Sequence, residues 1–464
     1  MTPLSTHAST RSAIARGEYE TARRLLQAAL AQRPEDTDAM CLLALALWRG
    51  PGEMDGAASQ LQRARTLCPA DPRILTLSAS LVLHLGELEA AVSFAEQALA
   101  ADIQHAPAYV VLSRSDPRRV NDSQLKCMLS LAQGAGLGPR RLRPLHNAIG
   151  RVYDARGEFD AAFSHFERSN ALAQGCYQPG LHETRLAQAR EFFTPQFFEP
   201  HRRLGVRGAG CVFVIGMPRS GSTLVEQMLA AHPQTGTCHE SDALNHVEAS
   251  WRRALPAQPA VSGDFKHYRA IDAGRLAHSA RAYLGYTARQ MRIASPARRI
   301  DKHLSNFLHM PLIALMFPDA VALHTHRHPL DVCLSCFTQG FDGHWYANDL
   351  NHLAHFYLTY MDYMRLWSSL FPGLIHHCRY EDIVADFEPQ ARRIVRGTGL
   401  EWHDACAQPH LAGGFVSTAS AAQVREPVHQ ARMQRWRQYE KHLRPLIAAL
   451  GGHAQIERMH REFS

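Results

Sequence analysis

The sequence lacks any apolar run long enough to cross a membrane. Its longest apolar runs, such as Cys41 to Trp48, are far shorter than the roughly 18 residues that a membrane-spanning helix needs. The first residues also lack a charged segment followed by an apolar core, which is the pattern of a secretory signal. We therefore expect a soluble, cytoplasmic protein with no membrane partner.

Charge of either sign is also scarce. Charged residues make up 20% of the chain, and 50 Lys and Arg against 43 Asp and Glu leave a net charge of +7. This mild excess favours an anionic ligand, but it lacks the clustered basic run of a nucleic-acid binder, so we expect no nucleic-acid partner. The ten cysteines follow no regular spacing, and reduced thiols are expected rather than a disulfide framework or a zinc knuckle. His324, His326 and His328 lack helical ligand spacing, so no metal site is predicted.

What the sequence does have is length and apolar content. Its 464 residues correspond to about three domain-equivalents. Apolar residues make up 46% of the chain, which is enough for sizeable buried cores and excludes a disordered protein.

The first third of the chain repeats with a period near 34 residues. Each repeat places a glycine five residues before an alanine: Gly17 and Ala22, Gly52 and Ala57, Gly86 and Ala91, Gly157 and Ala162. This pattern resembles the tetratricopeptide repeat, whose paired helices approach closely through small residues. Between Ile103 and Leu145 prolines and glycines interrupt the pattern, and one degenerate helical pair is expected there.

Stacked helical pairs form a solenoid whose concave face commonly binds a polypeptide or another subunit. We therefore predict a polypeptide acceptor or partner on the repeat face, with a purely scaffolding role as the alternative and a homodimer left open. The predicted boundaries are repeats over residues 1–172, a linker over 173–209 and a second domain over 210–464. The linker is expected to contain a helix from Leu181 to Phe193.

The second domain begins with a pattern that predicts an anion site. The apolar run Cys211 to Ile215 leads into Gly216-Met-Pro-Arg-Ser-Gly-Ser-Thr223, and Leu224, Met228 and Leu229 then recur at helical spacing. A second apolar run extends from Ala320 to His324. Such runs suit strands buried in a parallel sheet. Because a helix start offers free N–H groups and the positive end of a dipole, the loop is expected to bind an anion.

The loop differs from that of nucleotide triphosphatases at one decisive position. The frame G-x-x-x-x-G-K-[ST] is met by Gly216, Gly221 and Thr223, but Ser222 occupies the lysine position. Arg219 instead places a fixed positive charge inside the loop, and a guanidinium suits forked recognition of phosphate or sulfate oxygens. A nucleotide-dependent kinase is therefore the weaker alternative.

The loop resembles the P-R-S-G-[ST]-T motif of sulfotransferases that use 3′-phosphoadenosine 5′-phosphosulfate. The resemblance is to the bacterial type that joins tetratricopeptide repeats to a sulfotransferase domain, and this type is similar to protein-tyrosine sulfotransferases. It implies a P-loop-like α/β domain with a central parallel sheet, following an all-α repeat solenoid. It also implies that the 5′-phosphosulfate is bound by the residues Pro218, Arg219, Ser220, Gly221, Ser222 and Thr223.

Further motifs follow in the order of this family, from Cys211 to about Leu450. Arg327 to Ser335 matches R-x-P-x-D-x-x-x-S, which implies that Arg327 and Ser335 bind the 3′-phosphate; pairing of Arg327 with Asp331 in a surface turn is the alternative. Arg299 to Phe307 matches D-K-x-P-x-N-[FY], with Leu304 in place of the proline. The other matching segments are Arg379 to Val384, which contains Tyr380 near the cofactor, and the carboxyl-terminal closing segment, Ser417 to Val428 with Arg435 to Tyr439.

Sulfuryl transfer needs a base for the acceptor proton and positive charge on the sulfuryl oxygens, and cationic side chains supply that charge without a metal. The resemblance implies Glu240 as base, with His239 as its rival and a loop or helix-cap carboxylate as the structural alternative. Lys302 is implied as general acid or clamp on the bridging oxygen, unless it only pairs with Asp301. The remaining roles are polarisation of the sulfate by Arg219, a hydrogen bond to the leaving phosphate from Ser420, and contact with the 3′-phosphate by Arg435.

These observations predict a metal-independent sulfotransferase that modifies a hydroxyl, with a protein tyrosine as the leading acceptor. The tyrosine preference rests on the resemblance at Glu240. A glycan or small-molecule acceptor stays open, and a repeat scaffold with an inactive transferase fold is the non-enzymatic alternative.

Overall fold

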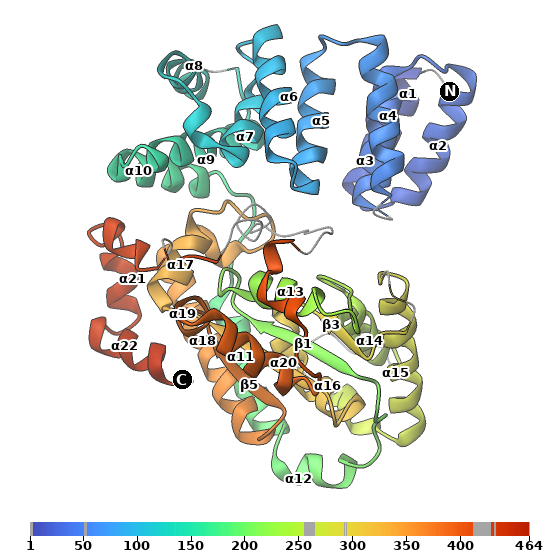
Figure 1. The fold of residues 1–464 in the computed structure, drawn as a ribbon, viewed down its shortest axis with the longest axis vertical. Coiled ribbons are helices and arrows are strands. Elements are labelled where there is room, and N and C mark those ends of the chain that lie inside the picture. The colour runs from blue at the N-terminus through green and yellow to red at the C-terminus, as the bar shows by residue number, and fades with distance from the viewer. Residues whose placement is uncertain are drawn as a thin grey trace. The chain divides into compact units, whose positions relative to one another are not determined.

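The computed structural model describes residues 3–50, 53–134, 136–254, 265–291, 293, 295–411, 428–430 and 433–463. The chain divides into two compact units, Met1–Leu172 and Ala173–Ser464. Figure 1 shows the first unit as helices alone and the second as helices around a central sheet. The predicted fold class, a helical repeat region followed by a parallel α/β domain, is confirmed.

The first unit consists of helical pairs that bury small residues as well as leucines where the helices meet. Ala57, Ala64 and Ala98 have no exposed surface, which allows the helix axes to approach closely. Gly86 ends α5 in the left-handed conformation, at a φ of 84°, which glycine adopts without a steric cost. The helices are α1 Pro3–Ala15, α2 Tyr19–Gln32, α3 Thr37–Arg49, α4 Met54–Leu67, α5 Pro72–Leu85, α6 Leu88–Ala101, α7 Ala106–Ser115, α8 Asp122–Gln133, α9 Pro139–Ala155 and α10 Phe159–Ala171.

The region where the repeat pattern fades is still helical. Helices α7 and α8 occupy it, and Asn121 caps α8 through a reciprocal capping box with Gln124. Tyr109, Leu125 and Met128 are buried in one cluster with neighbouring repeats. The interrupted pattern therefore reflects short helices and turns rather than a break in the stack.

The second unit contains a sheet of five parallel strands in the order β2-β3-β1-β4-β5. Neighbouring parallel strands require crossover connections, and these carry the helices of the domain. The predicted strands at Cys211 and Ala320 correspond to β1 and β4. The strands are β1 Cys211–Gly216, β2 Thr235–Thr237, β3 Arg298–Asp301, β4 Val321–His326 and β5 Ile375–Arg379.

Side chains that alternate along β1 pack on both faces of the sheet. Val212 and Val214 lie in a buried cluster with Met228 and Val395, whereas Phe213 contacts Tyr283 and Phe317 in ring packing. The helices are α11 Pro179–Phe192, α12 Pro195–Phe198, α13 Ser222–Ala230, α14 Ala243–Arg253, α15 Ala273–Ala288, α16 Met310–Met316, α17 Pro329–Phe337, α18 Leu350–Leu370, α19 Tyr380–Ala385, α20 Phe387–Gly397, α21 Arg444–Ala449 and α22 His453–Arg461.

Two findings bear on the expectations from composition. In the part of the chain that the structure describes, no helix has both the length and the apolar character that a membrane span requires.

Cys333 and Cys336 form a C-x-x-C pair on α17, and both are free and buried. Burial raises the pKa of the Cys336 thiol to about 12, so at neutral pH it is not the thiolate that binds metals or reacts.

Candidate active site

The predicted anion loop joins β1 to the start of α13. Its backbone is tightly wound, with positive φ angles of 71° at Arg219 and 97° at Gly221. A Cβ atom on Gly221 would lie 2.4 Å from Cδ2 of Tyr380, so only glycine fits where the loop passes this ring. The loop therefore leads in a tight turn into the N-terminus of α13, the end of a helix that favours anions.

A cavity of about 770 Å³ opens beside this loop. The structure brings together seven of the residues singled out in the sequence, since its lining includes Pro218, Arg219, Gly221, Ser222, Thr223, Glu240 and Lys302. Ser220 is buried instead, and its hydroxyl is 2.8 Å from the hydroxyl of Thr325 on β4. Ser220 thus ties the loop to the sheet.

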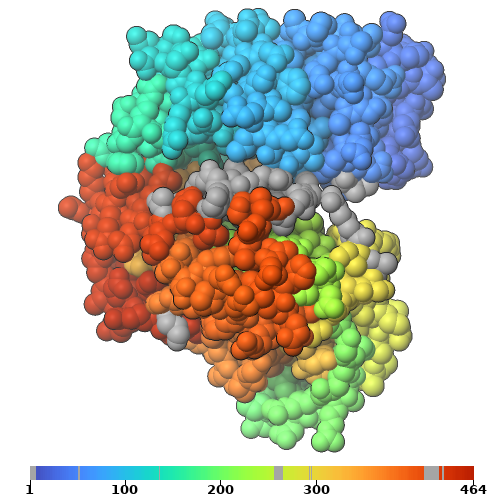
Figure 2. Space-filling model, viewed as in Figure 1, coloured from blue at the N-terminus to red at the C-terminus, as the bar shows by residue number. Residues whose placement is uncertain are grey.

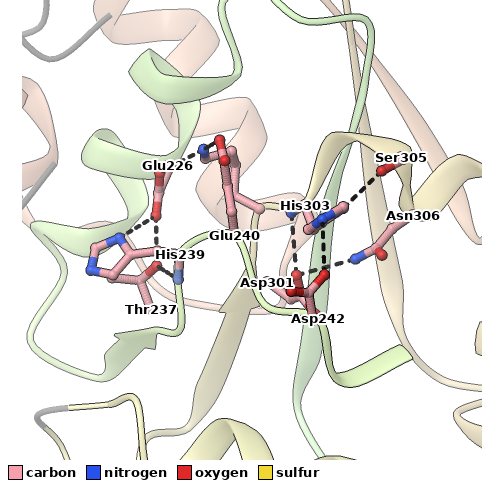
Figure 3. A network of polar contacts seen from close by, with 10 residues as sticks. Glu226, Thr237, His239, Glu240, Asp242, Asp301, His303, Ser305 and Asn306 are labelled. Carbon is pink, nitrogen blue, oxygen red and sulfur yellow. Dashed lines mark hydrogen bonds and ion pairs between the residues drawn. The ribbon is translucent and has the colours of Figure 1, made fainter. Parts of the chain in front are cut away.

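Lys302 is buried between two carboxylates, and Figure 3 shows this polar network from close by. Its ammonium Nζ lies 2.5 Å from Oε1 of Glu240 and 3.8 Å from Oε2 of Glu226. Lys302 and Glu226 are 1% exposed, whereas the Glu240 side chain is 46% exposed and lines the cavity. Lys302 therefore pairs with these two glutamates rather than with the neighbouring Asp301.

Glu226 is a member of this network that the sequence analysis missed. Burial raises its pKa, but Lys302, His239 and the Thr237 hydroxyl stabilise the carboxylate more strongly, so the net shift of the pKa is downward. A signal was present, because Glu226 falls among apolar residues in the helix after the loop. A charged residue at a buried helical position usually has a specific partner.

His239, the rival base, is directed toward Glu226. Its Nδ1 lies 2.9 Å from Oε1 of Glu226, and Figure 3 shows the imidazole turned toward this carboxylate. Among the described residues, the lining of the cavity includes Glu240 but not His239. The carboxylate of Glu240, rather than the imidazole of His239, therefore faces the cavity.

The turn that presents Lys302 is closed by the carboxylate of Asp301. This carboxylate accepts hydrogen bonds from the backbone N–H of His303 at 3.2 Å, the Asn306 amide at 3.1 Å and the Tyr283 hydroxyl at 2.9 Å. Asp301 is fully buried, and burial raises its pKa to about 7 despite these bonds. The turn forms with Leu304 in the usual proline position because these side chains hold it.

A second group of predicted residues adjoins the loop. Nε of Arg219 donates a hydrogen bond to the Ser335 hydroxyl at 2.8 Å. The guanidinium of Arg327 lies 4.8 Å from the centre of the Tyr380 ring and 3.3 Å from the Asp331 carboxylate. The pairing with Asp331 considered from the sequence is therefore present, but it is buried rather than in a surface turn.

Asp331 also holds the carboxyl-terminal segment. Its two carboxylate oxygens accept hydrogen bonds from the backbone N–H groups of Gln434 and Trp436, at 2.8 Å and 3.1 Å. Arg435 lies between these two residues and is half-buried. Ser420, predicted to contact the leaving phosphate, lies outside the described residues.

The remaining wall of the cavity is largely aromatic. Its aromatic side chains, here called the aromatic wall, are Tyr177, Phe307, Phe341, Trp345, Tyr346 and Phe356. Tyr346 and Phe356 stack with ring centres 3.7 Å apart. His303 and His344 also line the cavity, and burial lowers the pKa of both imidazoles. His303 and Phe307 belong to the Arg299 to Phe307 motif, but the other wall residues were not predicted, because the wall combines segments distant in sequence.

The fold and the cavity define a class of protein: a parallel α/β domain with an anion loop and a buried lysine–carboxylate pair facing one cavity. A family model described as "Sulfotransferase family" matches residues 211–404, and one described as "Tetratricopeptide repeat" matches residues 10–72. Residues 211–404 thus match the sulfotransferase family and residues 10–72 the tetratricopeptide repeat, as the sequence motifs predicted.

Individual proteins are similar to this chain at low sequence identity. A protein of Aquifex aeolicus (strain VF5), named only as uncharacterized, is 28% identical over 402 residues, which cover 85% of this chain and 52% of the relative. The chain thus spans about half the length of this curated relative. The sulfotransferase domain of the Synechococcus PCC 7002 olefin synthase is 18% identical, with 56% of this chain and 94% of that one covered and a TM-score of 0.38. The structure of MamA is also 18% identical in sequence. The match covers 35% of this chain and 93% of the MamA chain, with a TM-score of 0.28.

Proposed function

We propose that this protein transfers the sulfuryl group of 3′-phosphoadenosine 5′-phosphosulfate to a hydroxyl acceptor. The observation that carries the proposal is that the anion loop and the Lys302–Glu240 pair face one cavity. An anion donor and an acceptor hydroxyl can therefore meet between them. The sulfotransferase family of residues 211–404 supports the same reaction class.

The loop fits the phosphosulfate end of this donor. Positive charge comes from Arg219, and Ser222 and Thr223 place hydroxyls at the start of α13. The arginine that would hold the 3′-phosphate, Arg327, is kept in place by the Tyr380 ring and Asp331. Ser335 would act partly through Arg219, whose guanidinium it orients by accepting a hydrogen bond.

Glu240 is the proposed general base. In the reaction the acceptor oxygen forms a bond to sulfur as the bond from sulfur to the phosphate oxygen breaks, and the acceptor proton passes to the Glu240 carboxylate. Proton transfer to a positioned carboxylate contributes about 10²–10⁴-fold to such reactions. The exposed, cavity-facing position of Glu240 suits this role better than that of the fully buried Glu226.

Lys302 is proposed to stabilise the charge that develops on the leaving phosphate. A buried ammonium in a site that excludes water acts more strongly on such charge than an exposed one. Glu226 holds Lys302 from the side away from Glu240, and its low pKa keeps it negatively charged. The Glu226 carboxylate therefore still balances the positive charge of Lys302 when Glu240 accepts a proton.

The acceptor is proposed to be a phenol, such as a protein tyrosine. The aromatic wall offers flat apolar surface for a ring, and rings pack favourably at offset or edge-to-face geometries. The lowered pKa values of His303 and His344 keep these two imidazoles neutral at pH 7. The wall therefore offers little positive charge for acidic groups, and the repeat unit is the proposed binding surface for the rest of a polypeptide acceptor.

A binding titration tests the donor half of the proposal. The protein is titrated with 3′-phosphoadenosine 5′-phosphate and, separately, with ATP in the absence and presence of magnesium. We expect metal-independent binding of the bisphosphate and weak binding of ATP, because Ser222 replaces the lysine that contacts β- and γ-phosphates. Tight binding of Mg-ATP would instead favour a kinase.

Transfer of labelled sulfate tests the acceptor half. A tyrosine-containing peptide, a simple phenol and a glycan are compared at equal hydroxyl concentration. Faster labelling of the two phenols than of the glycan is expected. Preferential labelling of the glycan would overturn the acceptor assignment and leave the donor assignment intact.

A further inference from the structure

A cluster of potential metal ligands lies outside the cavity, where the last helix packs on α17. Glu457 and His460 are three residues apart on α22 and so project from the same side of this helix. His328 lies directly before α17, at its N-cap. Figure 2 shows the carboxyl-terminal segment, in red, at the surface of the molecule.

The spacing of the donor atoms suits a tetrahedral ion. One ligand atom from each of His328, Glu457 and His460 lies within 4.8 Å of the other two. Nε2 of His328 and Oε1 of Glu457 are 3.3 Å apart. Two donors at the usual zinc distances of about 2.0–2.1 Å, in tetrahedral arrangement, are separated by about 3.3 Å.

The histidine ligands are held by their surroundings. The His328 side chain is 8% exposed, and its ring stacks on Trp436 at 5.4 Å with an interplanar angle of 4°. Its Nδ1 is buried without a hydrogen-bond partner among the described residues. Packing therefore fixes the ring with its Nε2 directed at Glu457.

Glu381 supplies the outer carboxylate typical of metal sites. One of its oxygens accepts a hydrogen bond from the backbone N–H of His328 at 2.9 Å, and the other lies 3.3 Å from Nε2 of His460. A carboxylate beside a ligating imidazole fixes the ring orientation and raises its basicity. Glu381 therefore orients both histidine-bearing segments of the cluster.

We propose that His328, Glu457 and His460 bind a divalent metal ion, with Zn²⁺ as the best fit. Two imidazoles and one carboxylate form a ligand set that zinc prefers, and water would take the fourth position. This proposal departs from the sequence prediction of no metal site, which considered only the spacing of His324, His326 and His328. The Glu-x-x-His spacing at Glu457 was the signal that could have found it.

The ion would act on structure rather than on sulfuryl transfer. None of its three ligands is among the described residues that line the cavity. It would join α22 to the turn that carries Arg327 and thereby stabilise the carboxyl-terminal end of the domain against that turn. Because the ion binds only the folded arrangement, it would raise the melting temperature of the protein.

Metal titration of the full chain tests the proposal. Protein freed of metal with a chelator is titrated with ZnCl₂ alone in competition with a chromogenic chelator. Tight binding of one Zn²⁺ ion per chain is expected. The affinity for Zn²⁺ should be at least about 10-fold lower in Glu457→Gln, and tight binding should be lost in His460→Ala. The Glu457 side chain is 51% exposed, so the isosteric glutamine leaves the fold intact even where His460→Ala does not.

The matched control is His453→Ala, which removes an exposed histidine from the same helix. This variant should keep both the tight binding of one Zn²⁺ ion and the zinc-dependent rise in melting temperature. Glu457→Gln should weaken the binding and reduce the rise in melting temperature. Absence of tight Zn²⁺ binding in the unmodified protein would overturn the proposal. Equal binding by all the variants would do the same, because it would mean adventitious binding at surface histidines or thiols.

Discussion

At the scale of single residues, the decisive feature is a lysine buried between two carboxylates. A charge taken out of water is stable only with close partners, and removal of one partner from a buried pair is costly. Lys302 has Glu226 on its buried side and Glu240 on its exposed side. Loss of either carboxylate would therefore leave the buried lysine with one partner.

Glu240→Gln is expected to lower kcat by about 10²–10⁴-fold, because the amide cannot accept the acceptor proton. Affinity for the bisphosphate should stay within a few-fold, since the anion loop is unchanged. The measurements are initial rates of sulfate transfer and a bisphosphate titration. Glu388→Gln, which changes an exposed glutamate on α20 that does not line the cavity, is the control. A greater loss in His239→Gln than in Glu240→Gln would assign the base to His239.

Asp301→Asn is expected to change how stability depends on pH. Because burial raises the pKa of Asp301 from 3.8 in the unfolded chain to about 7 in the fold, the folded state binds the proton more tightly between these values. The contribution of Asp301 to the free energy of unfolding is therefore present at low pH and is lost as the pH rises toward 7. Relative to the variant, the free energy of unfolding should fall by about 1.4 kcal/mol per pH unit between pH 5 and 7.

Denaturant unfolding at several pH values checks this slope. The asparagine keeps a carbonyl oxygen for the His303 and Asn306 donors, so the variant should fold. Parallel pH curves for the two proteins would contradict a buried carboxyl with a raised pKa.

At the scale of elements, the strand–loop–helix unit from β1 to α13 depends on one backbone position. Gly221 combines a φ of 97° with the close approach of Tyr380. The φ angle is a property of the loop itself, whereas the close approach involves Tyr380, the first residue of α19. The local sequence around Gly221 does not reveal this contact. The shape of the loop is therefore a property of two elements rather than of the loop alone.

Gly221→Ala is expected to weaken bisphosphate binding by about tenfold or more, because a non-glycine residue in this conformation costs about 1–2 kcal/mol and its Cβ displaces the Tyr380 ring. Calorimetric titration provides the measurement. Gly285→Ala is the matched control, since Gly285 lies within α15 and a Cβ at this position would meet open space. Equal affinity in both variants would show that the anion binds elsewhere.

At the scale of the whole molecule, the two units have separate hydrophobic cores. Leu26, Leu47 and Leu61 are buried together in the repeats, whereas the sheet of the second unit is packed around Val214, Met228 and Ile300. Because interior packing is local, a cavity made in one core should leave the other intact. Repeat stability and donor binding are then separable properties.

Leu61→Ala should destabilise the repeats by about 2–5 kcal/mol through the cavity it leaves. Hydrogen exchange of amides in α3 to α6 should become faster, while the bisphosphate affinity stays unchanged. Leu67→Ala, at a position that is 42% exposed, should alter stability by less than about 0.5 kcal/mol. A joint loss of repeat protection and bisphosphate affinity would mean that the two units are energetically coupled.

The sequence by itself determined the repeats and the strand–loop–helix unit that carries Arg219. These are local properties, because helical period, glycine position and the Arg219 charge are encoded within a few neighbouring residues. The sequence also shows Leu304 in place of the proline of the sulfotransferase motif, but it does not show whether the turn at this position still forms. The Asp301 contacts that close this turn come partly from Tyr283, a residue on another helix.

Only the tertiary structure decided which side chains meet. Glu226 faces Lys302, Ser335 orients Arg219, Asp331 holds the backbone at Gln434, and Glu457 reaches His328. Each pair joins segments far apart in the chain, and no local pattern encodes such a distance. Packing of helices on both faces of the sheet brings these segments together, because burying their apolar faces leaves the polar groups at the strand ends beside one another.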